Sequence, residues 1–473
     1  MDSGVSGDAQ RIEQMTWILF LKIYDAKETE WEICDNNYTS LIPNNYRWRN
    51  WAVDNKDGKA ATGPELLKFV DYGLFPAMKN LPITENTPIK QAIVRSVFED
   101  INNYMKNGVL LREVVNIIDE IDFTKFEERH AFNEIYESLL KELQAQGSSG
   151  EYYTPRAVTD FMVKVINPKL GEVVADFACG TGGFLTSTLK HLDDQVKTTQ
   201  DKETYDNSIY GIEKKPFPYL LCITNMILHD VDMPMIIHGN TLEKNVRDYT
   251  DGEKFDIVLM NPPYGGSEQE AVKNNFPMDL RSGETADLFI SVIMYRLKEN
   301  GRAAVILPDG FLFGSDVKTN IKKKLLSEFN LHTVIRMTAD VFAPYTTIKT
   351  NILFFDNTHP TEKIWFYRMD MPEGYKHFSK TKPIKLEHFN DAIQWWSNRK
   401  EIFIDESYKS KCYSIKEIAN EDYDLDLCGF PQKNVEILPP DEVIKNYREK
   451  RAELTAKIDD LLDRIESALG EKK

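Results

Sequence analysis

The residues best suited to chemistry form one short run, Asn261-Pro262-Pro263-Tyr264, directly after the apolar segment 255–260. Two consecutive prolines remove backbone donors and stiffen the chain, which leaves carbonyl groups facing outward. The amide oxygen of Asn261 and the carbonyl of Pro262 can then accept the two hydrogens of an exocyclic amino group. Those bonds aim the nitrogen lone pair at a methyl donor, and Tyr264 offers a flat face on which an extruded base can stack. The run predicts amino-group methylation; the alternative is a purely structural Pro-Pro turn.

A second run, residues 173–185, is an apolar strand that leads into a glycine-rich turn and then a helix. Such a turn allows close backbone approach to a ligand, and the helix start supplies free N–H groups. It lacks the Lys-Ser/Thr of a phosphate loop, which disfavours a nucleotide-driven motor. Asp176, before the turn, would repel a pyrophosphate but could accept bonds from an ammonium group. Glu213 ends the next strand, where a carboxylate accepts ribose hydroxyls. Together they indicate S-adenosylmethionine rather than NAD.

Both runs belong to a part of the chain in which short β-branched or apolar segments alternate with helical segments. This alternation indicates a doubly wound α/β sheet. The last segments follow one another with little helix between them, which predicts an antiparallel end on a mostly parallel sheet. The predicted strands are residues 173–177, 208–212, 235–238, 255–260, 303–307, 333–336, 352–355 and 363–367.

Residues 10–145 are predicted to be mainly helical, because stretches such as 91–105 and 112–119 space apolar residues by three and four. The stretch 35–63 is rich in Asn, Trp and Gly and is predicted to be a long loop within this helical domain. Its segment 46–51 mixes aromatic residues with arginines. That mixture would suit stacking on nucleic acid, or it simply anchors the loop to its own domain.

The C-terminal part of the chain shows a third sequence pattern. After Pro439 and Pro440, apolar residues recur at alternating steps of three and four from Ile444 to Ala468, with Arg451 as the one charge in the series. This is an a/d seam of about four heptads. Because a single amphipathic helix is marginal in water, the seam predicts packing on a partner helix or back on its own domain.

The 473 residues are too many for one simple domain. No apolar stretch approaches the roughly 18 residues of a membrane helix, and the first residues show no secretory signal. The five cysteines include no CxxC pair, so we expect neither disulfides nor a metal site, and a cytoplasmic location. The net charge of −17 argues against DNA binding by this chain alone, although residues 309–411 carry about +3 by charge counting.

The motifs, in their order along the chain, resemble those of amino-directed DNA methyltransferases. The similarity is closest to the modification (M) subunit of type I restriction-modification systems, and it includes the helical prefix and the helical tail. The resemblance implies an S-adenosylmethionine-dependent methyltransferase fold, and methyl transfer to the N6 amino group of adenine in a specific DNA sequence. The matching motifs are EYYTPR at 151–156, DFACGTGGFL at 176–185, Glu213, GNTL at 239–242, NPPY at 261–264, GRAAVILP at 301–308 and TNILFF at 350–355.

The resemblance also implies roles for single residues. In that family the segment like 152–155 closes over the methionine part of the cofactor, and the turn 181–183 lies beneath it. Asn240 resembles the position beside the cofactor's adenine, although it is not acidic. The family usually has Asp-Pro at 176–177, where this chain has Asp-Phe, which predicts a slightly different turn. The predicted catalytic residues are Asn261, Pro262, Pro263 and Tyr264, and the predicted cofactor residues are Glu151, Tyr152, Tyr153, Thr154, Pro155, Arg156, Asp176, Ala178, Gly180, Thr181, Gly182, Gly183, Glu213 and Asn240.

Other methyltransferases share parts of this pattern. NPPY also occurs in enzymes that methylate protein glutamine or RNA amino groups, but these generally lack a long helical prefix. Methylation of cytosine carbon 5 needs a cysteine nucleophile, and no Pro-Cys occurs here. By resemblance, Asn rather than Ser at the start of the motif favours adenine over cytosine N4. A non-catalytic methyltransferase-fold scaffold is the alternative from another class, which methyl transfer to DNA would exclude.

The expected organisation is a helical N-terminal domain at 1–146, a methyltransferase domain at 147–411, and a C-terminal segment at 412–473 whose long helix serves subunit assembly. No stretch resembles a separate target-recognition domain, so another chain is expected to read the base sequence. The resemblance implies double-stranded DNA with a flipped adenine, a specificity (S) subunit with two copies of this chain, and a restriction (R) subunit as partners, and no membrane.

Overall fold

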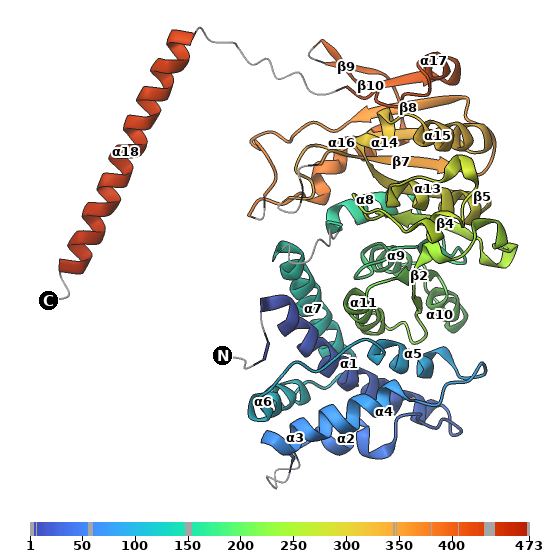
Figure 1. The fold of residues 1–473 in the computed structure, drawn as a ribbon, viewed down its shortest axis with the longest axis vertical. Helices are drawn as coiled ribbons and strands as arrows, with labels where there is room; N and C mark the ends of the chain where they lie inside the picture. The colour runs from blue at the N-terminus through green and yellow to red at the C-terminus, as the bar shows by residue number, and fades with distance from the viewer. Residues whose placement is uncertain are drawn as a thin grey trace. The chain divides into compact units, whose positions relative to one another are not determined.

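The computed structural model describes residues 4–5, 7–54, 60–146, 154–343, 346, 348–379, 381–404, 406–429 and 440–470 (Figure 1). The chain divides into two units, Met1–Gly429 and Phe430–Lys473. Among the described helices, none combines the length and the apolar character that crossing a membrane requires.

The first part of the larger unit is helical, as its apolar periodicity predicts. At the start of α6 the side chain of Asn107 acts as an N-cap and accepts from the Val109 and Leu110 N–H groups. The helices are α1 (Gly7–Cys34), α2 (Trp48–Trp51), α3 (Gly63–Phe69), α4 (Phe75–Lys79), α5 (Ile89–Phe98), α6 (Gly108–Asp119) and α7 (Phe126–Gln146), with the short helical segments η1 (Asn44–Tyr46) and η2 (Val70–Leu74) between them.

The helix predicted over residues 91–105 is shorter than expected, because α5 ends at Phe98. Beyond it, side chains take the place of helical carbonyls as backbone partners. Asn103 Oδ1 accepts from the Met105 N–H at 3.1 Å, and Gln14 Oε1 accepts from the Tyr104 N–H at 3.0 Å. Asparagine competes with helical hydrogen bonding in this way, and apolar periodicity alone does not reveal it.

The aromatic and arginine segment 46–51 is engaged within its own domain. Trp48 and Trp51 are buried. Arg49 lies 3.0 Å from Asp25 Oδ1 and 2.8 Å from Glu32 Oε2, both on α1. The fold therefore favours the anchoring interpretation of this segment over stacking on nucleic acid.

The rest of the larger unit is built on one sheet in the order β3-β2-β1-β4-β5-β7-β6-β8-β10-β9. Strands β1 to β5 pair in parallel, and β7 runs antiparallel between β5 and β6. The predicted doubly wound sheet with an antiparallel end is confirmed, and each of the eight predicted segments forms a strand. The strands are β1 (Val174–Asp176), β2 (Ile209–Glu213), β3 (Met235–His238), β4 (Phe255–Met260), β5 (Leu297–Pro308), β6 (Asn330–Arg336), β7 (Thr350–Asp356), β8 (Lys363–Arg368), β9 (Ile402–Ile404) and β10 (Ser407–Ser414).

The sequence did not reveal β9 and β10, which extend the sheet beyond β8. In β10 only Ser410 is buried, so this strand lacks the apolar run by which the buried strands were recognised. β10 also crosses residue 411, where the methyltransferase domain was expected to end. The compact unit continues instead to Gly429.

Helices cover both faces of the sheet (Figure 1). On β4, Ile257 and Leu259 belong to the core that contains α8 and α16, whereas Val258 and Met260 belong to the core that contains α13 and α15. This alternation is the period of two that a strand imposes, and it explains why β4 is apolar throughout. The helices of this part are α8 (Arg156–Ile166), α9 (Gly183–Asp193), α10 (Thr199–Asp206), α11 (Pro216–Leu228), α12 (Glu270–Lys273), α13 (Thr285–Arg296), α14 (Asp309–Phe313), α15 (Val317–Glu328), α16 (Asn390–Ser397) and α17 (Ile415–Asn420), with the short segments η3 (Thr241–Glu243), η4 (Val246–Asp248), η5 (Asp251–Glu253), η6 (Met278–Leu280) and η7 (Leu386–Phe389).

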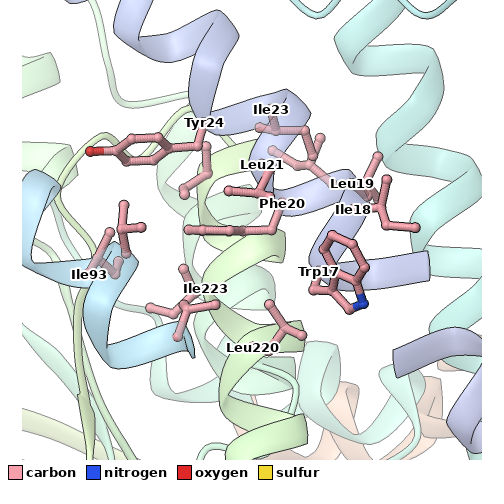
Figure 2. Close-up of a cluster of buried hydrophobic side chains, with 14 of the residues drawn as sticks. Trp17, Ile18, Leu19, Phe20, Leu21, Ile23, Tyr24, Ile93, Leu220 and Ile223 are labelled. Atoms are coloured by element: carbon pink, nitrogen blue, oxygen red, sulfur yellow. The ribbon is translucent and has the colours of Figure 1, made fainter. Parts of the chain in front are cut away.

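Helix α11 joins the helical N-terminal part to the sheet. Every residue of α11 from Pro218 to Leu228 is buried. Next to it, Asp230 lies 3.1 Å from Lys27 Nζ and 2.9 Å from Arg129 Nη2. Figure 2 shows side chains of α1, α5 and α11 in one hydrophobic core, among them Trp17, Ile18, Leu19, Phe20, Leu21, Ile23, Tyr24, Ile93, Leu220 and Ile223.

The smaller unit contains α18 (Pro440–Gly470), which confirms the helix predicted in the tail. The seam residues Ile444, Tyr447, Leu454, Ile458 and Leu461 are each at least 51% exposed. An apolar stripe of this kind is what a partner helix covers in a coiled coil.

The core around α1 predicts the effect of a cavity. Phe20 is fully buried beside the rings of Tyr24 and Phe98. Replacing Phe20 with Ala should lower the free energy of unfolding by about 3–5 kcal/mol, the usual cost of such a truncation. Chemical denaturation measures the change. The matched control is Ile33→Ala on the same helix, where the side chain is 77% exposed; its effect should stay within about 0.5 kcal/mol. Equal effects would contradict this packing.

Candidate active site

A pocket of about 200 Å³ opens at the carboxyl ends of β1, β2, β3 and β4. Parallel strands end at the same edge of a sheet, so segments far apart in the sequence meet there. The pocket is lined by Phe177, Ala178, Gly180, Glu213, Lys214, Lys215, Pro218, Gly239, Asn240, Thr241, Asn261, Pro262, Pro263, Tyr264, Glu268, Thr285 and Phe289.

The glycine-rich turn between β1 and α9 has a backbone shape that favours glycine. Gly180 and Gly182 have φ values of +55° and +82°, in the left-handed region. A Cβ at Gly182 would lie 2.9 Å from Met226 Cε and 3.0 Å from Cys222 Sγ, both on α11. The turn therefore packs closely on α11 on one side, while Ala178 and Gly180 line the pocket on the other.

Glu213, the last residue of β2, lines the pocket and also holds the turn. Its Oε2 accepts from the Gly180 N–H at 2.9 Å, and its Oε1 accepts from the Lys215 N–H at 2.8 Å. Each carboxylate oxygen can accept a second hydrogen bond. A ligand in the pocket thus meets a fixed carboxylate at the strand end, where the sequence predicts it.

Asp176 lies beneath the turn, is 2% exposed, and is not part of the pocket lining. Its Oδ1 accepts from the Ala178 N–H at 3.1 Å. Burial outweighs this bond and, together with the negative charge of Glu213, raises the pKa of Asp176 to about 8. A cation placed near this carboxyl would favour its ionised form.

Phe177 and Asn240 both line the pocket, on the segments after β1 and β3. The Phe177 side chain is buried, and its ring lies 4.4 Å from the guanidinium carbon of Arg296. Its carbonyl accepts from Thr241 Oγ1 at 2.6 Å. Asn240 Oδ1 accepts from the Leu242 N–H at 3.2 Å. These bonds tie the segment after β3 to the segment after β1.

Residues 261–264 follow β4 directly, and all four line the pocket. Asn261 Nδ2 donates to Thr154 Oγ1 at 3.0 Å. The Tyr264 hydroxyl donates to Asn261 Oδ1. Burial raises the pKa of Tyr264 well above its ordinary value, so the hydroxyl stays protonated and remains a donor at neutral pH. Both ends of the Asn261 amide are therefore hydrogen-bonded within the protein.

Some predicted cofactor residues lie elsewhere. Arg156 does not line the pocket and pairs with Glu137 of α7, with an Nη2–Oε1 distance of 2.7 Å. Thr181, Gly182 and Gly183 belong to the turn but not to the pocket lining. Thr154 and Pro155 precede α8, whereas Glu151, Tyr152 and Tyr153 lie outside the described residues. Among the described residues, no group of three or more His, Cys, Asp or Glu side chains is arranged to hold a metal ion.

Sequence reasoning missed several residues that line the pocket. Lys214 and Glu268 come from different segments, and their Nζ and Oε1 atoms are 3.8 Å apart. Lys214 directly follows Glu213, so its place next to a strand end could have been inferred. Phe289 belongs to α13 and gives no local signal, because only the packing of that helix brings it to the pocket. The other lining residues that were not predicted as site residues are Phe177, Lys215, Pro218, Gly239, Thr241 and Thr285.

Two family models match the chain. The N-6 DNA methylase model matches residues 127–436, which include the whole pocket. The HsdM N-terminal domain model matches residues 3–118, which correspond to the helical N-terminal part.

Relatives in both sequence and structure match nearly the whole chain. The type I restriction enzyme EcoEI methylase subunit of Escherichia coli is 47% identical over 100% of this chain and 96% of its own length. A crystal structure of a type I modification subunit from Vibrio vulnificus YJ016 is 39% identical, with a TM-score of 0.79 over 92% of this chain and 95% of that chain. A further chain, solved in work on assembly and conformational transition of the type I R-M system, is 35% identical, with a TM-score of 0.81 over 98% and 95%.

The raised pKa of Asp176 predicts a pH-dependent loss of stability. The folded protein keeps this proton up to about pH 8, whereas the unfolded chain releases it near pH 4. Stability from this group is therefore fully present below about pH 4 and is lost as pH rises toward 8. Relative to Asp176→Asn, the free energy of unfolding should fall by up to roughly 1.4 kcal/mol per pH unit. Denaturant titrations of both proteins between about pH 6 and pH 8 measure the difference, and a constant difference would contradict the raised pKa.

Proposed function

The chain belongs to the N-6 DNA methylase family as a modification subunit of a type I restriction-modification system, and we propose that its pocket holds S-adenosylmethionine beside a flipped adenine. The family assignment resolves the choice between adenine and cytosine N4, which the residues left open: the chain is an adenine-N6 DNA methyltransferase. The observation that carries the proposal is that one pocket is lined by both Glu213 and residues 261–264.

The donor set of the pocket fits S-adenosylmethionine. Glu213 is a buried carboxylate that lines the pocket at the end of β2, where ribose hydroxyls would donate to it. Asp176, beneath the turn, would be stabilised in its ionised form by the ammonium group of the methionine part. Asn240 lies on the wall where the resemblance expects the adenine ring. Glycine at 180 keeps the backbone bare at the pocket wall. The bound cofactor supplies the methyl group.

The residues of the catalytic turn act on the target base. Asn261 Oδ1 and the Pro262 carbonyl accept the two N6 hydrogens of adenine, which localises the nitrogen lone pair for attack. The two prolines hold these acceptors rigidly. Once methylated, the nitrogen is acidic enough to release its extra proton to solvent without a dedicated base. Tyr264 provides the stacking face for the extruded base.

The bonds already made by Asn261 set the conditions for base entry. The Tyr264 hydroxyl occupies Asn261 Oδ1, so the adenine amino group must take its place. Thr154 accepts from Asn261 Nδ2, which keeps Oδ1 as the atom available for exchange. Thr154 belongs to the segment 152–155, which resembles the part closing over the cofactor, and it therefore joins cofactor binding to the orientation of Asn261.

The proposed partners follow from the family of the chain and from the residues that α18 exposes. A specificity subunit would read the base sequence, with two copies of this chain in the complex, and a restriction subunit would join for cleavage. The exposed seam of α18 is suited to bind a helix of the specificity subunit. We place the reaction in the cytoplasm, where its DNA substrate would be found.

Replacing Asn261 with Ala tests the catalytic assignment. The change removes an acceptor that acts mainly in the transition state, so methyl transfer should fall by roughly 10²–10³-fold, as for comparable polar groups. Binding of S-adenosylmethionine should change little, because Glu213 and the glycine turn are intact. Transfer of labelled methyl groups to DNA and calorimetry measure the two properties. The control is Asn274→Ala, an exposed asparagine at the end of α12; activity of Asn261→Ala within a few-fold of the control would refute the role.

Two charges in the seam of α18 test the assembly assignment. Ile458 and Leu461 are 56% and 54% exposed, and burying each against a partner contributes about 1.5–3 kcal/mol. The double variant Ile458→Asp, Leu461→Asp should bind S-adenosylmethionine normally but fail to co-purify with the specificity subunit, because desolvated charges are costly in an apolar interface. Ala452→Asp with Ala456→Asp adds the same charge on the other side of α18 and should assemble. If both double variants assemble, another surface makes the contact.

A further inference from the structure

Glu137 is a buried carboxylate that the helical N-terminal part contributes to the packing around the glycine-rich turn. It lies on α7, is 7% exposed, and α7 packs beside α11. Its two oxygens receive a bidentate pair from Arg156, with Nε–Oε2 and Nη2–Oε1 distances of 2.9 Å and 2.7 Å. Paired hydrogen bonds of this kind fix geometry as well as adding energy.

The remaining guanidinium nitrogen of Arg156, Nη1, connects the Glu137–Arg156 pair to the glycine-rich turn. Arg156 Nη1 donates to Thr186 Oγ1 at 2.7 Å, and Thr186 Oγ1 donates to the Gly182 carbonyl at 3.1 Å. At Gly183 an added Cβ would lie only 3.1 Å from Arg156 Nη1. The guanidinium is therefore packed directly against the outer side of the turn.

A second route connects Glu137 to the same turn through α11. Asn225 Nδ2 is 3.3 Å from Glu137 Oε1 and 3.1 Å from the Thr181 carbonyl. Asn225 is fully buried. Because Thr181 and Gly182 are adjacent, the two routes reach consecutive carbonyls of the turn from one carboxylate.

The cluster contains buried charges, so removing one charged side chain should destabilise the other. Burial opposes ionisation of Glu137, but the Arg156 guanidinium and Lys190 outweigh it and hold the pKa of Glu137 below its ordinary value. Removing one partner of a buried pair leaves the other charge uncompensated. Arg156 would then lose the group that fixes its orientation toward Thr186.

We propose that Glu137 is a positioning residue for the cofactor pocket, acting through Arg156 and Asn225 on the carbonyls of Thr181 and Gly182. This inference rests on the proposed function, because it takes the pocket to hold S-adenosylmethionine. It gives the helical N-terminal part a direct share in shaping that pocket. It also gives a role to Arg156, which the sequence assigned to the cofactor although the structure places it outside the pocket lining.

The Lys27–Asp230 and Arg129–Asp230 pairs provide a comparison within the same interface. They also join the helical N-terminal part to the region of α11, but Asp230 lies beyond the end of that helix, and neither pair contacts the glycine turn. A residue that only holds the two parts together should, like these pairs, have no effect on the pocket when it is replaced. Glu137 should differ from them in its effect on the pocket.

The test compares Glu137→Gln with Glu134→Gln, an exposed residue one turn earlier on α7. The full chain, with its specificity partner for activity, is assayed for KM of S-adenosylmethionine and for kcat. Glu137→Gln should raise KM roughly tenfold or more, the factor that corresponds to about 1.4 kcal/mol, with kcat at saturating cofactor within about twofold. Hydrogen exchange in the peptide covering residues 178–186 should rise as well. The control should leave KM and exchange unchanged.

A structural role alone gives a different pattern. If Glu137→Gln lowers thermal stability but leaves KM and exchange in the turn unchanged, the proposal is wrong. Thr186→Val, which removes only the hydroxyl that links Arg156 to Gly182, serves if Glu137→Gln does not fold. It should raise KM in the same direction, and an unchanged KM would also overturn the proposal.

The proposed function fails in a distinguishable way. If the unaltered chain does not bind S-adenosylmethionine, or if Glu213→Ala binds it as tightly as the unaltered chain, the pocket assignment itself is wrong. If Glu213→Ala weakens binding and Glu137→Gln does not, the pocket stands and only the positioning role of Glu137 is lost.

Discussion

The site depends on one constraint: β1 pairs in parallel with β2 on one side and β4 on the other. Parallel pairing brings the glycine turn, Glu213 and Asn261 to one edge of the sheet, although they lie far apart in the sequence. β1 is only three residues long and fully buried, so the turn begins as soon as the strand leaves the core. The cores on both faces fix these strand ends, and the functional groups stand on short loops that the strands position.

The parts of the fold that could be predicted are those where burial leaves its mark on local sequence. β4 is apolar because both of its faces are covered, and Asn261 was assigned correctly to the strand end because the apolar run stops there. β10 was not predicted from the sequence because most of its residues are not buried. Phe289 was not predicted because its place depends on how α13 packs, and Arg156 was assigned to the cofactor because it is the last residue of the EYYTPR motif. Membership of this motif did not show that Arg156 lies outside the pocket lining.

The helical N-terminal part and the sheet share a core and therefore do not behave as independent bodies. α11 is buried from Pro218 to Leu228, since α1, α5 and α7 cover one side of it and the sheet lies on the other. A domain boundary was expected after residue 146, but the hydrophobic contacts of Leu220 and Ile223 with the helical N-terminal part cross that boundary (Figure 2). Any displacement of the helical part consequently strains the helix against which Gly182 is packed.

The bond between Tyr264 and Asn261 has a consequence for discrimination between bases. In the proposed reaction an incoming base competes with the protein's own hydroxyl for Asn261 Oδ1. Adenine offers two amino hydrogens and can replace that donor while also engaging the Pro262 carbonyl. Thymine presents a carbonyl oxygen at the equivalent edge, and inserting it would leave Asn261 Oδ1 facing another acceptor, a penalty of about 1–3 kcal/mol for each buried polar group left unpaired. In the proposed reaction, this resting contact would therefore disfavour bases without an amino group before any chemistry begins.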